Sequence, residues 1–247
     1  MAKLHNIKLT IEYDGTNYCG WQTQKGDITV QETITKALTV IVKHKVTLYG
    51  ASRTDSGVHA KGQIANFLTK SRMTPNQFVR ALNSNLPDDI VIRSAKEVDK
   101  TFNSRFNTRS KLYRYAILNS PIPSALDRNF YCFVPYRISL ARMRKTARYL
   151  VGEHNFRAFA TKSSAKENCV RRIYSIRITK KGDYIYVDIK GNGFLYNMVR
   201  TIVGTLLLAA QGKIRPEYIK EILNSQERKK AGPTAPAAGL CLLKINY

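Results

Sequence analysis

One short stretch of the chain, residues 50–60, combines side chains that could do nucleophilic or acid–base chemistry. It holds one carboxylate, Asp55, with a guanidinium two residues earlier, Arg53, and three hydroxyls, between glycines at 50 and 57. Glycine permits a positive φ or a close backbone approach, and a nearby cation favours the ionised form of a carboxyl group. The stretch therefore predicts a rigid polar loop that presents an ionised Asp55.

The same stretch also has a purely structural interpretation. An aspartate in a Thr-Asp-Ser-Gly turn often accepts hydrogen bonds from the backbone of its own turn. Perturbed carboxylates are frequently structural as well as catalytic. Local chemistry alone leaves both roles open for Asp55.

The charge balance of the chain indicates a polyanionic partner. Lys and Arg number 41 against 17 Asp and Glu in 247 residues, a net charge of +24. Residues 1–103 contain 14 Lys and Arg and 9 Asp and Glu, a net charge of +5. Residues 104–247 contain the remaining 27 basic and 8 acidic residues, a net charge of +19. Such an excess favours nucleic acid first and an acidic membrane surface second. With 43% hydrophobic residues, the composition is that of a folded globular protein.

Other sequence features limit the class of protein. No apolar run approaches the roughly 20 residues of a membrane-spanning helix, and residues 1–15 lack the apolar region of a signal peptide. The four cysteines and four histidines are scattered, without the spacing of a metal site. We therefore expect a cytoplasmic protein with free thiols, no bound metal and no membrane contact.

The stretch at 50–60, Gly-Ala-Ser-Arg-Thr-Asp-Ser-Gly-Val-His-Ala, resembles the catalytic motif of the TruA family of tRNA pseudouridine synthases. Four further segments resemble that family: Tyr-Asp-Gly…Gly-Trp-Gln at 13–22, Arg-Phe…Tyr-Arg-Tyr at 105–115, Phe-Leu-x-x-Met-Val-Arg at 194–200 and Gly-Leu at 239–240. The resemblance extends from about residue 8 to residue 247, nearly the whole chain.

The resemblance implies isomerisation of uridine to pseudouridine at positions 38–40 of the tRNA anticodon stem-loop. The reaction moves the bond to C1′ from N1 to C5 without loss of atoms or electron transfer, so no cofactor is expected. By resemblance, Asp55 attacks the sugar, either as a nucleophile at C1′ or by removing a C2′ proton. Tyr113 stacks on the base and assists removal of the C5 proton, and Arg200 pairs with Asp55.

Further residues receive expected roles in RNA binding. Because the resemblance gives the pairing with Asp55 to Arg200, we expect Arg53 to contact a substrate phosphate or to orient the base, and Thr54 to bind the substrate. The resemblance implies that Leu240 helps to wall the base pocket, and that the protein is a homodimer with one tRNA spanning both subunits. The candidates for phosphate contact are Lys61, Arg105, Arg109, Lys111 and Arg114.

Other roles, such as core packing, also remain open for these residues. A tyrosine in an alternating strand, such as Tyr113 or Tyr115, is commonly core packing, and Arg200 could reach solvent or phosphate instead of a carboxylate. The main alternative function is a non-catalytic basic RNA-binding module. Residues 190–195 partly match an RNA-recognition motif, but Asn192 and Asn197 stand where stacking aromatics are needed. A membrane-surface protein would need an exposed amphipathic helix with a large apolar face, which the sequence lacks.

The elements that must position these residues indicate an α+β fold in two subdomains. We predict an N-terminal subdomain over residues 1–103, carrying the Asp55 loop, and a basic C-terminal subdomain over 104–247, carrying Tyr113 and Arg200. Each is expected to be a mainly antiparallel sheet with helices on one face, and the sheets to meet at a central RNA-binding cleft. Alternating or apolar runs predict strands at 7–13, 46–49, 63–68, 90–98, 111–118, 171–179, 184–189 and 240–245.

Capping and helical periodicity predict the helices. Thr29 with Glu32, and Thr74-Pro75 with Gln77, are helix-start signals. Apolar residues at helical spacing predict further helices near 140–150, at 198–210 and near 219–223. Residues 119–135, with three prolines, and 232–239 are predicted to be loops.

Overall fold

The computed structural model describes residues 4–161 and 168–247. The chain divides into two compact units, Met1–Arg109 together with Leu242–Tyr247, and Ser110–Cys241. The predicted boundary lay six residues earlier, between 103 and 104, and assigned the C-terminal strand to the second unit. The structure instead places Leu242–Tyr247 in the first unit, because this strand joins the first unit's sheet.

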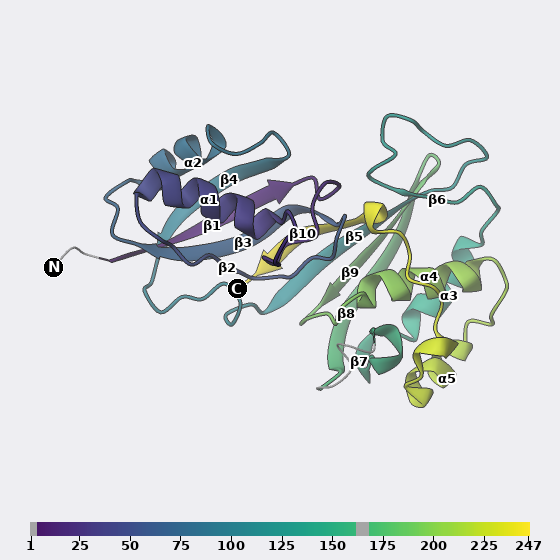
Figure 1. Ribbon diagram of the computed structural model, residues 1–247. Helices are drawn as coiled ribbons and strands as arrows, with labels where there is room; N and C mark the ends of the chain where they lie inside the picture. The colour runs from purple at the N-terminus through teal and green to yellow at the C-terminus, as the bar shows by residue number, and fades with distance from the viewer. Residues whose placement is uncertain (1–3, 162–167) are drawn as a thin grey trace. The chain divides into compact units, whose positions relative to one another are not determined.

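The first unit is a mainly antiparallel sheet with two helices on one face (Figure 1). Its strands lie in the order β4 (Ile90–Val98), β1 (His5–Tyr13), β3 (His59–Thr69) and β10 (Leu240–Asn246), and the short β2 (Tyr49–Gly50) pairs with β3. Leu9 of β1 lies opposite Ala65 of β3 and Ala95 of β4. The helices are α1 (Val30–Val42) and α2 (Pro75–Asn83).

Local sequence explains these elements. In β1 the apolar side chains alternate with polar ones, and Ile7, Leu9 and Ile11 are buried. Thr29 caps α1 by accepting from the N–H of Glu32, and Thr74 and Gln77 form a complete capping box at the start of α2. The predicted strand at 46–49 is shorter in the structure, which pairs only Tyr49 and Gly50.

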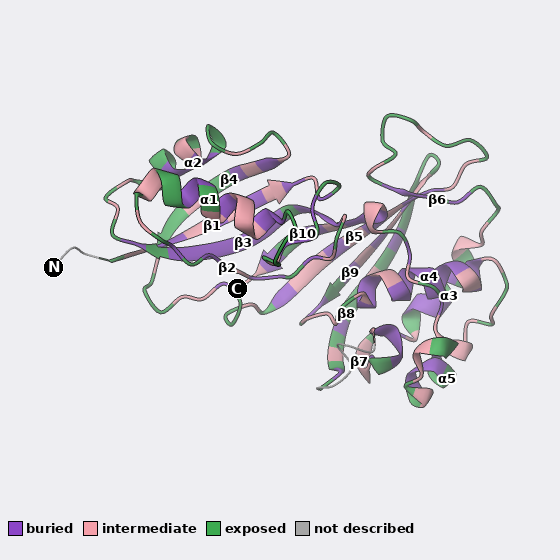
Figure 2. Ribbon diagram, in the orientation of Figure 1, coloured by how far each residue is buried: buried purple, intermediate pink, exposed green. Residues whose placement is uncertain are grey.

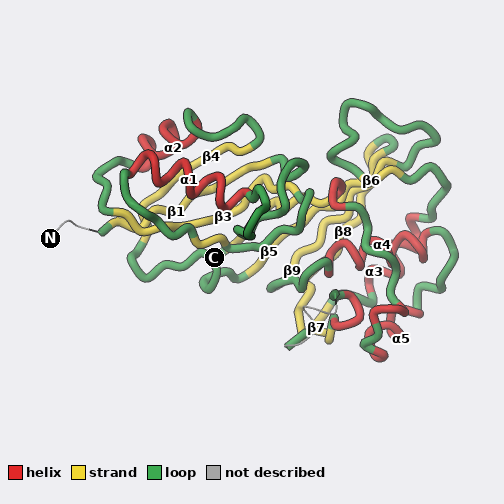
Figure 3. Tube along the Cα trace, in the orientation of Figure 1, coloured by secondary structure: helices red, strands yellow, loops and turns green. Residues whose placement is uncertain are grey.

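The second unit is a sheet in the order β5 (Ser110–Leu118), β9 (Tyr184–Gly191), β8 (Val170–Lys181) and β7 (Gly152–Asn155). The two-residue β6 (Cys132–Phe133) runs parallel to β5, whereas β9 pairs antiparallel with both β5 and β8, and β8 pairs antiparallel with β7. Helices α3 (Leu140–Arg148), α4 (Met198–Ala210) and α5 (Tyr218–Ser225) complete it (Figure 3). Helix α4 is buried along most of its length (Figure 2).

The α+β class with mainly antiparallel sheets is confirmed. β4 and α4 have the predicted bounds, and β1, β5, β8 and β9 differ from prediction by one or two residues at their ends. β7 was not predicted, because Gly-Glu-His-Asn has no apolar alternation and becomes a strand through its pairing with β8. Across residues 4–161 and 168–247, no helix is long and apolar enough to cross a membrane.

Candidate active site

The loop that carries Asp55 joins β2 to β3 in the first unit and is anchored at its base. The Ala51 N–H donates to the Ile64 carbonyl at 2.8 Å. The buried Gln63 side chain bonds Ser52 twice, donating from Nε2 to its carbonyl at 2.7 Å and accepting from its N–H at 3.3 Å. Since Gln63 lies on β3, the first residues of the loop have a fixed position on the sheet.

The far side of the loop is held by the last residue of β1 and by the segment that follows this strand. The hydroxyls of Tyr13 and Thr54 are 2.7 Å apart, and the Thr54 carbonyl accepts from the Trp21 N–H at 3.1 Å. The Tyr18 carbonyl accepts from the Gly57 N–H at 3.2 Å and from Ser56 Oγ at 3.3 Å. Trp21 is buried, as expected for a core tryptophan.

Asp55 therefore lies in a loop whose backbone is bonded on both sides. Asp55 is half-buried. Its backbone carbonyl accepts a hydrogen bond from the Val58 N–H at 3.2 Å, and this bond closes a tight turn in which Gly57 has a φ of 74°. Arg53 is exposed, whereas Thr54 is buried and its hydroxyl bonds Tyr13. Thr54 thus has a structural partner in addition to its expected role in substrate positioning.

Gly20 offers a direct test of how rigidly the loop must be held. A Cβ at Gly20 (φ 83°) would lie 2.5 Å from the Thr54 carbonyl oxygen, whereas a Cβ at Gly26 (φ 87°) would meet nothing within 4 Å. Gly26→Ala should therefore cost only the left-handed backbone conformation, about 1–2 kcal/mol. Gly20→Ala should cost about 1–3 kcal/mol more in the free energy of unfolding, and should reduce the turnover rate because the Asp55 loop is displaced. Stability is measured by denaturation and activity by initial rates. If both variants lost equal stability and equal activity, the close approach of position 20 to the Thr54 carbonyl would not be what holds the loop.

Tyr113 lies in the second unit on the buried face of β5, opposite Ile189 of β9. Its ring and that of Phe194 form a T-shaped pair, with 5.4 Å between centroids and an interplanar angle of 90°. Edge-to-face packing of this kind fixes the orientation of an aromatic ring. Packing against Phe194 therefore sets the orientation of the Tyr113 ring.

Arg200 is the third residue of α4 and is half-buried on an otherwise apolar helix. Its Nε donates to the Ala235 carbonyl at 2.8 Å, and its Nη1 donates to Asn197 Oδ1 at 3.0 Å. The Arg200 carbonyl in turn accepts from the Ala235 N–H at 3.2 Å. These bonds set the plane of the guanidinium group, which is the requirement for a bidentate contact with a carboxylate or phosphate.

The loop at 231–239 connects Arg200 to β5. Tyr115, two residues from Tyr113 on the same face, donates its hydroxyl to the Pro236 carbonyl at 2.8 Å. Burial raises the pKa of Tyr115 far above its usual range, against a smaller opposing effect of the Arg200 charge, so this hydroxyl stays protonated and donates. The adjacent carbonyls of Ala235 and Pro236 thus hold Arg200 and Tyr115, respectively. Leu240, the first residue of β10, is buried.

The predicted phosphate contacts differ in their surroundings. Arg114 makes a bidentate ion pair with Asp188 at 2.7 and 2.8 Å and stacks on Tyr186, and the hydrogen bond to Asp188 raises the pKa of Arg114. Lys61, Arg105 and Arg109 are exposed, and Lys111 is half-buried. Because its charge already has a partner within the unit, we do not retain Arg114 among the phosphate contacts.

The structure distributes the predicted catalytic residues over the two units. Asp55 belongs to the first unit, and Tyr113 and Arg200 belong to the second. Sequence reasoning gave no role to Phe194, Asn197 or the carbonyls of residues 235 and 236. Only Asn197 left a signal: it precedes α4 at φ 62°, a conformation in which asparagine is enriched. In the described residues, no group of three or more His, Cys, Asp or Glu side chains could hold a metal ion.

Comparison with known proteins decides the family. A model of the tRNA pseudouridine synthase family matches residues 9–107 and 146–247. The chain belongs to the tRNA pseudouridine synthase family. Members of this family are isomerases, so the protein is an enzyme, and the resemblance drawn from its sequence motifs is confirmed.

Relatives match the chain along its whole length. The tRNA pseudouridine synthase A of Thermoanaerobacter sp. strain X514 is 46% identical over 244 residues, which cover 99% of this chain and 100% of the relative. The enzymes of the same name from Acetivibrio thermocellus and Ruminiclostridium cellulolyticum are each 48% identical at the same coverage. A solved archaeal box H/ACA sRNP Nop10–Cbf5 complex shows 12% identity and a TM-score of 0.38, over 91% of this chain and 60% of that one, a likeness too weak to support an argument.

Proposed function

We propose that the protein isomerises uridine to pseudouridine at positions 38–40 of the tRNA anticodon stem-loop, with Asp55 as the catalytic carboxylate. The observation that carries this proposal is the loop itself. Asp55 is half-buried in a turn whose backbone is bonded to β3 on one side and to the segment after β1 on the other. A carboxylate held this way needs little rearrangement of its loop to reach the sugar, and this lowers the free energy of activation.

The chemistry balances without a cofactor. The C1′–N1 bond of uridine breaks, the base turns, and a new bond joins C1′ to C5. The proton leaves C5 and N1 gains one, so the product is an isomer of the substrate. Asp55 acts at the sugar, either by bonding to C1′ or by taking the C2′ proton, and Tyr113 stacks on the base and assists loss of the C5 proton.

In this proposal Arg200 pairs with Asp55 when the two units act together. The Ala235 carbonyl and Asn197 Oδ1 already orient the guanidinium plane. A fixed guanidinium would keep Asp55 ionised and hold one rotamer, because bidentate pairs are geometrically specific. The exposed Arg53 would contact RNA, and Leu240 would line the pocket of the base. We also propose a cytoplasmic homodimer that binds tRNA through Lys61, Arg105, Arg109 and Lys111.

The alternative, a non-catalytic RNA-binding module, predicts that tRNA is bound but not changed. The test is to incubate unmodified tRNA with the protein and map pseudouridine by chemical labelling and mass analysis, since uridine and pseudouridine have the same mass. We expect pseudouridine at positions 38–40 and at no other uridine. Unmodified RNA after prolonged incubation with bound protein would favour the module, and modification elsewhere would refute the proposed target.

Two tyrosine variants distinguish a catalytic ring from a structural one. Tyr113→Phe keeps the stacking ring but removes the hydroxyl, and should lower the single-turnover rate about 100-fold or more if that hydroxyl assists proton transfer. Tyr115→Phe leaves the Pro236 carbonyl without its donor and should lower the free energy of unfolding by about 1–3 kcal/mol. A larger rate loss in Tyr115→Phe than in Tyr113→Phe would reverse the two assignments.

A further inference from the structure

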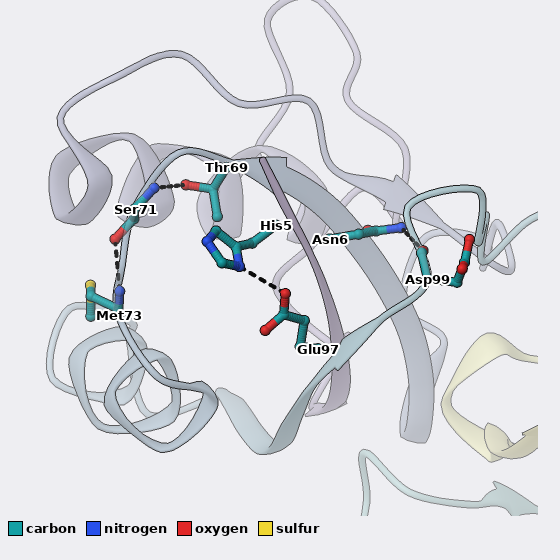
Figure 4. Close-up of polar contacts among 7 residues, drawn as sticks. All are labelled: His5, Asn6, Thr69, Ser71, Met73, Glu97 and Asp99. Carbon is teal, nitrogen blue, oxygen red and sulfur yellow. Dashed lines mark hydrogen bonds and ion pairs between the residues drawn. The ribbon is translucent and has the colours of Figure 1, made fainter. Parts of the chain in front are cut away.

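Residues 99–109, which lie between β4 and β5, are held on the first unit's sheet by buried polar side chains. Asn6 donates from Nδ2 to the carbonyl of Asp99 at 2.8 Å (Figure 4). The same nitrogen donates to the carbonyl of Phe102 at 2.9 Å. Asn66 Oδ1 accepts from the Ser104 N–H at 2.8 Å. Asn6 and Asn66 are both buried strand residues and are bonded to each other at 3.0 Å. The backbone of this segment is therefore fixed although it forms no helix or strand.

Ser104 connects the same segment to the base of the Asp55 loop. Its hydroxyl donates to the carbonyl of Tyr49, the first residue of β2, after which the loop begins. The Ser104 carbonyl accepts from the Thr108 hydroxyl at 2.8 Å and from the Tyr247 hydroxyl at 3.0 Å. The turn at 103–108 thus has a fixed position relative to the Asp55 loop within one unit.

This fixed turn presents an aromatic ring to solvent. Phe106 is 77% exposed, and the guanidinium carbon of Arg105 lies 5.5 Å from the centre of its ring. The turn is closed by Asn103 and Asn107: the Asn103 N–H donates to Asn107 Oδ1 at 2.8 Å, and the Arg105 N–H donates to Asn103 Oδ1 at 2.9 Å. Within the described part of the chain, Arg105 has no acidic partner.

One exposed apolar side chain is ordinary in a folded protein. Phe106 differs because its backbone is immobilised, a guanidinium without an acidic partner packs beside its ring, and the chain carries a charge of +24. Proteins recognise unpaired nucleotides by stacking bases on aromatic rings and by placing cations near the phosphates. We propose that Phe106 and Arg105 form a stacking platform for an unpaired base of the RNA, with Phe106 supplying the ring and Arg105 the charge. The inference rests on RNA being the substrate, as proposed above.

Fluorescence tests the stacking contact directly. The chain has one tryptophan, Trp21, which is 1% exposed, so Phe106→Trp would add the only solvent-exposed indole. We expect a tRNA anticodon stem-loop to quench the added fluorescence, and a fully paired RNA duplex of equal length to leave it unchanged. Binding of the stem-loop without quenching would overturn the proposal.

Affinity measurements separate stacking from charge. Phe106→Leu keeps an apolar side chain but removes the ring, and should raise the Kd for tRNA about 5- to 100-fold, with the same slope of log Kd against log salt. Arg105→Gln should reduce that slope by about 0.7–0.9, the effect of one lost phosphate contact. Tyr136→Leu, which removes a 50% exposed ring from the second unit, is the matched control and should leave the Kd unchanged.

The outcomes distinguish the platform from the proposed function. If the unaltered protein makes pseudouridine and Phe106→Leu binds tRNA as tightly as the unaltered protein, the stacking platform is refuted and the proposed function stands. If the unaltered protein makes no pseudouridine in tRNA, the proposed function fails. In that event quenching of Phe106→Trp by the stem-loop would still support an RNA-stacking surface.

Discussion

Asp55→Asn should bind tRNA with nearly unchanged affinity and form pseudouridine only at a small residual rate. The substitution keeps the shape and polarity of the side chain, and the loop is held by hydrogen bonds of Ala51, Ser52, Thr54 and residues 56–58. It removes the charge and the basicity that attack at C1′ or proton removal at C2′ requires. We expect a fall in single-turnover rate of at least about 1,000-fold, equivalent to roughly 4 kcal/mol in the activation barrier.

Asp88→Asn is the matched control for charge. It also removes one carboxylate from the first unit, but Asp88 is exposed and lies outside the loop. Its rate and Kd should equal those of the unaltered protein. If Asp55→Asn retained more than a few per cent of the activity, Asp55 would be a structural turn residue, as its local sequence also allows.

Arg200→Met should have the second largest effect. It replaces the guanidinium with an apolar side chain of similar length, so it removes the proposed partner of Asp55 and leaves the Ala235 carbonyl and Asn197 Oδ1 without their donor. We expect a fall in rate of about 100-fold or more, roughly 2.7 kcal/mol, and a loss of stability. Arg200→Lys keeps the charge but not the planar fork, and should be intermediate.

The pairing itself is tested by combining the variants. If Arg200 acts through Asp55, the double variant should be no slower than Asp55→Asn alone, because residues that act as a unit are not additive. Arg144→Met is the control, since it also removes a guanidinium bonded to a backbone carbonyl, that of Ile178. Full activity in Arg200→Met would exclude Arg200 from the mechanism.

Strongly periodic segments of the fold could be predicted from sequence. The bounds of β4 and α4 were predicted to the residue, because each segment carries apolar side chains that need burial and is bounded by turn signals. The domain boundary was harder. The return of Leu242–Tyr247 to the first unit depends on pairing with strands far away in sequence, which no local pattern records.

The candidate site shows the same division between local and distant information. Glycines at 50 and 57 correctly indicated a tight loop around Asp55, since Gly57 has φ 74° and a Cβ at Gly50 would lie 2.2 Å from Trp21 Nε1. The alternating pattern of β5 could not separate Tyr113 from Tyr115, because both lie on its buried face. What separates them is the Pro236 carbonyl, more than 100 residues away, which binds Tyr115 only through tertiary packing.

Release of the C5 hydrogen is the most direct test of the central claim, that Asp55 drives isomerisation of uridine in tRNA. When C1′ bonds to C5, the hydrogen on C5 must leave to solvent, so tRNA labelled with tritium at uridine C5 reports each event. We predict release by the unaltered protein and by Asp88→Asn, and release slower by at least about 1,000-fold by Asp55→Asn although it binds the same tRNA. Equal release by Asp55→Asn and the unaltered protein would contradict the account.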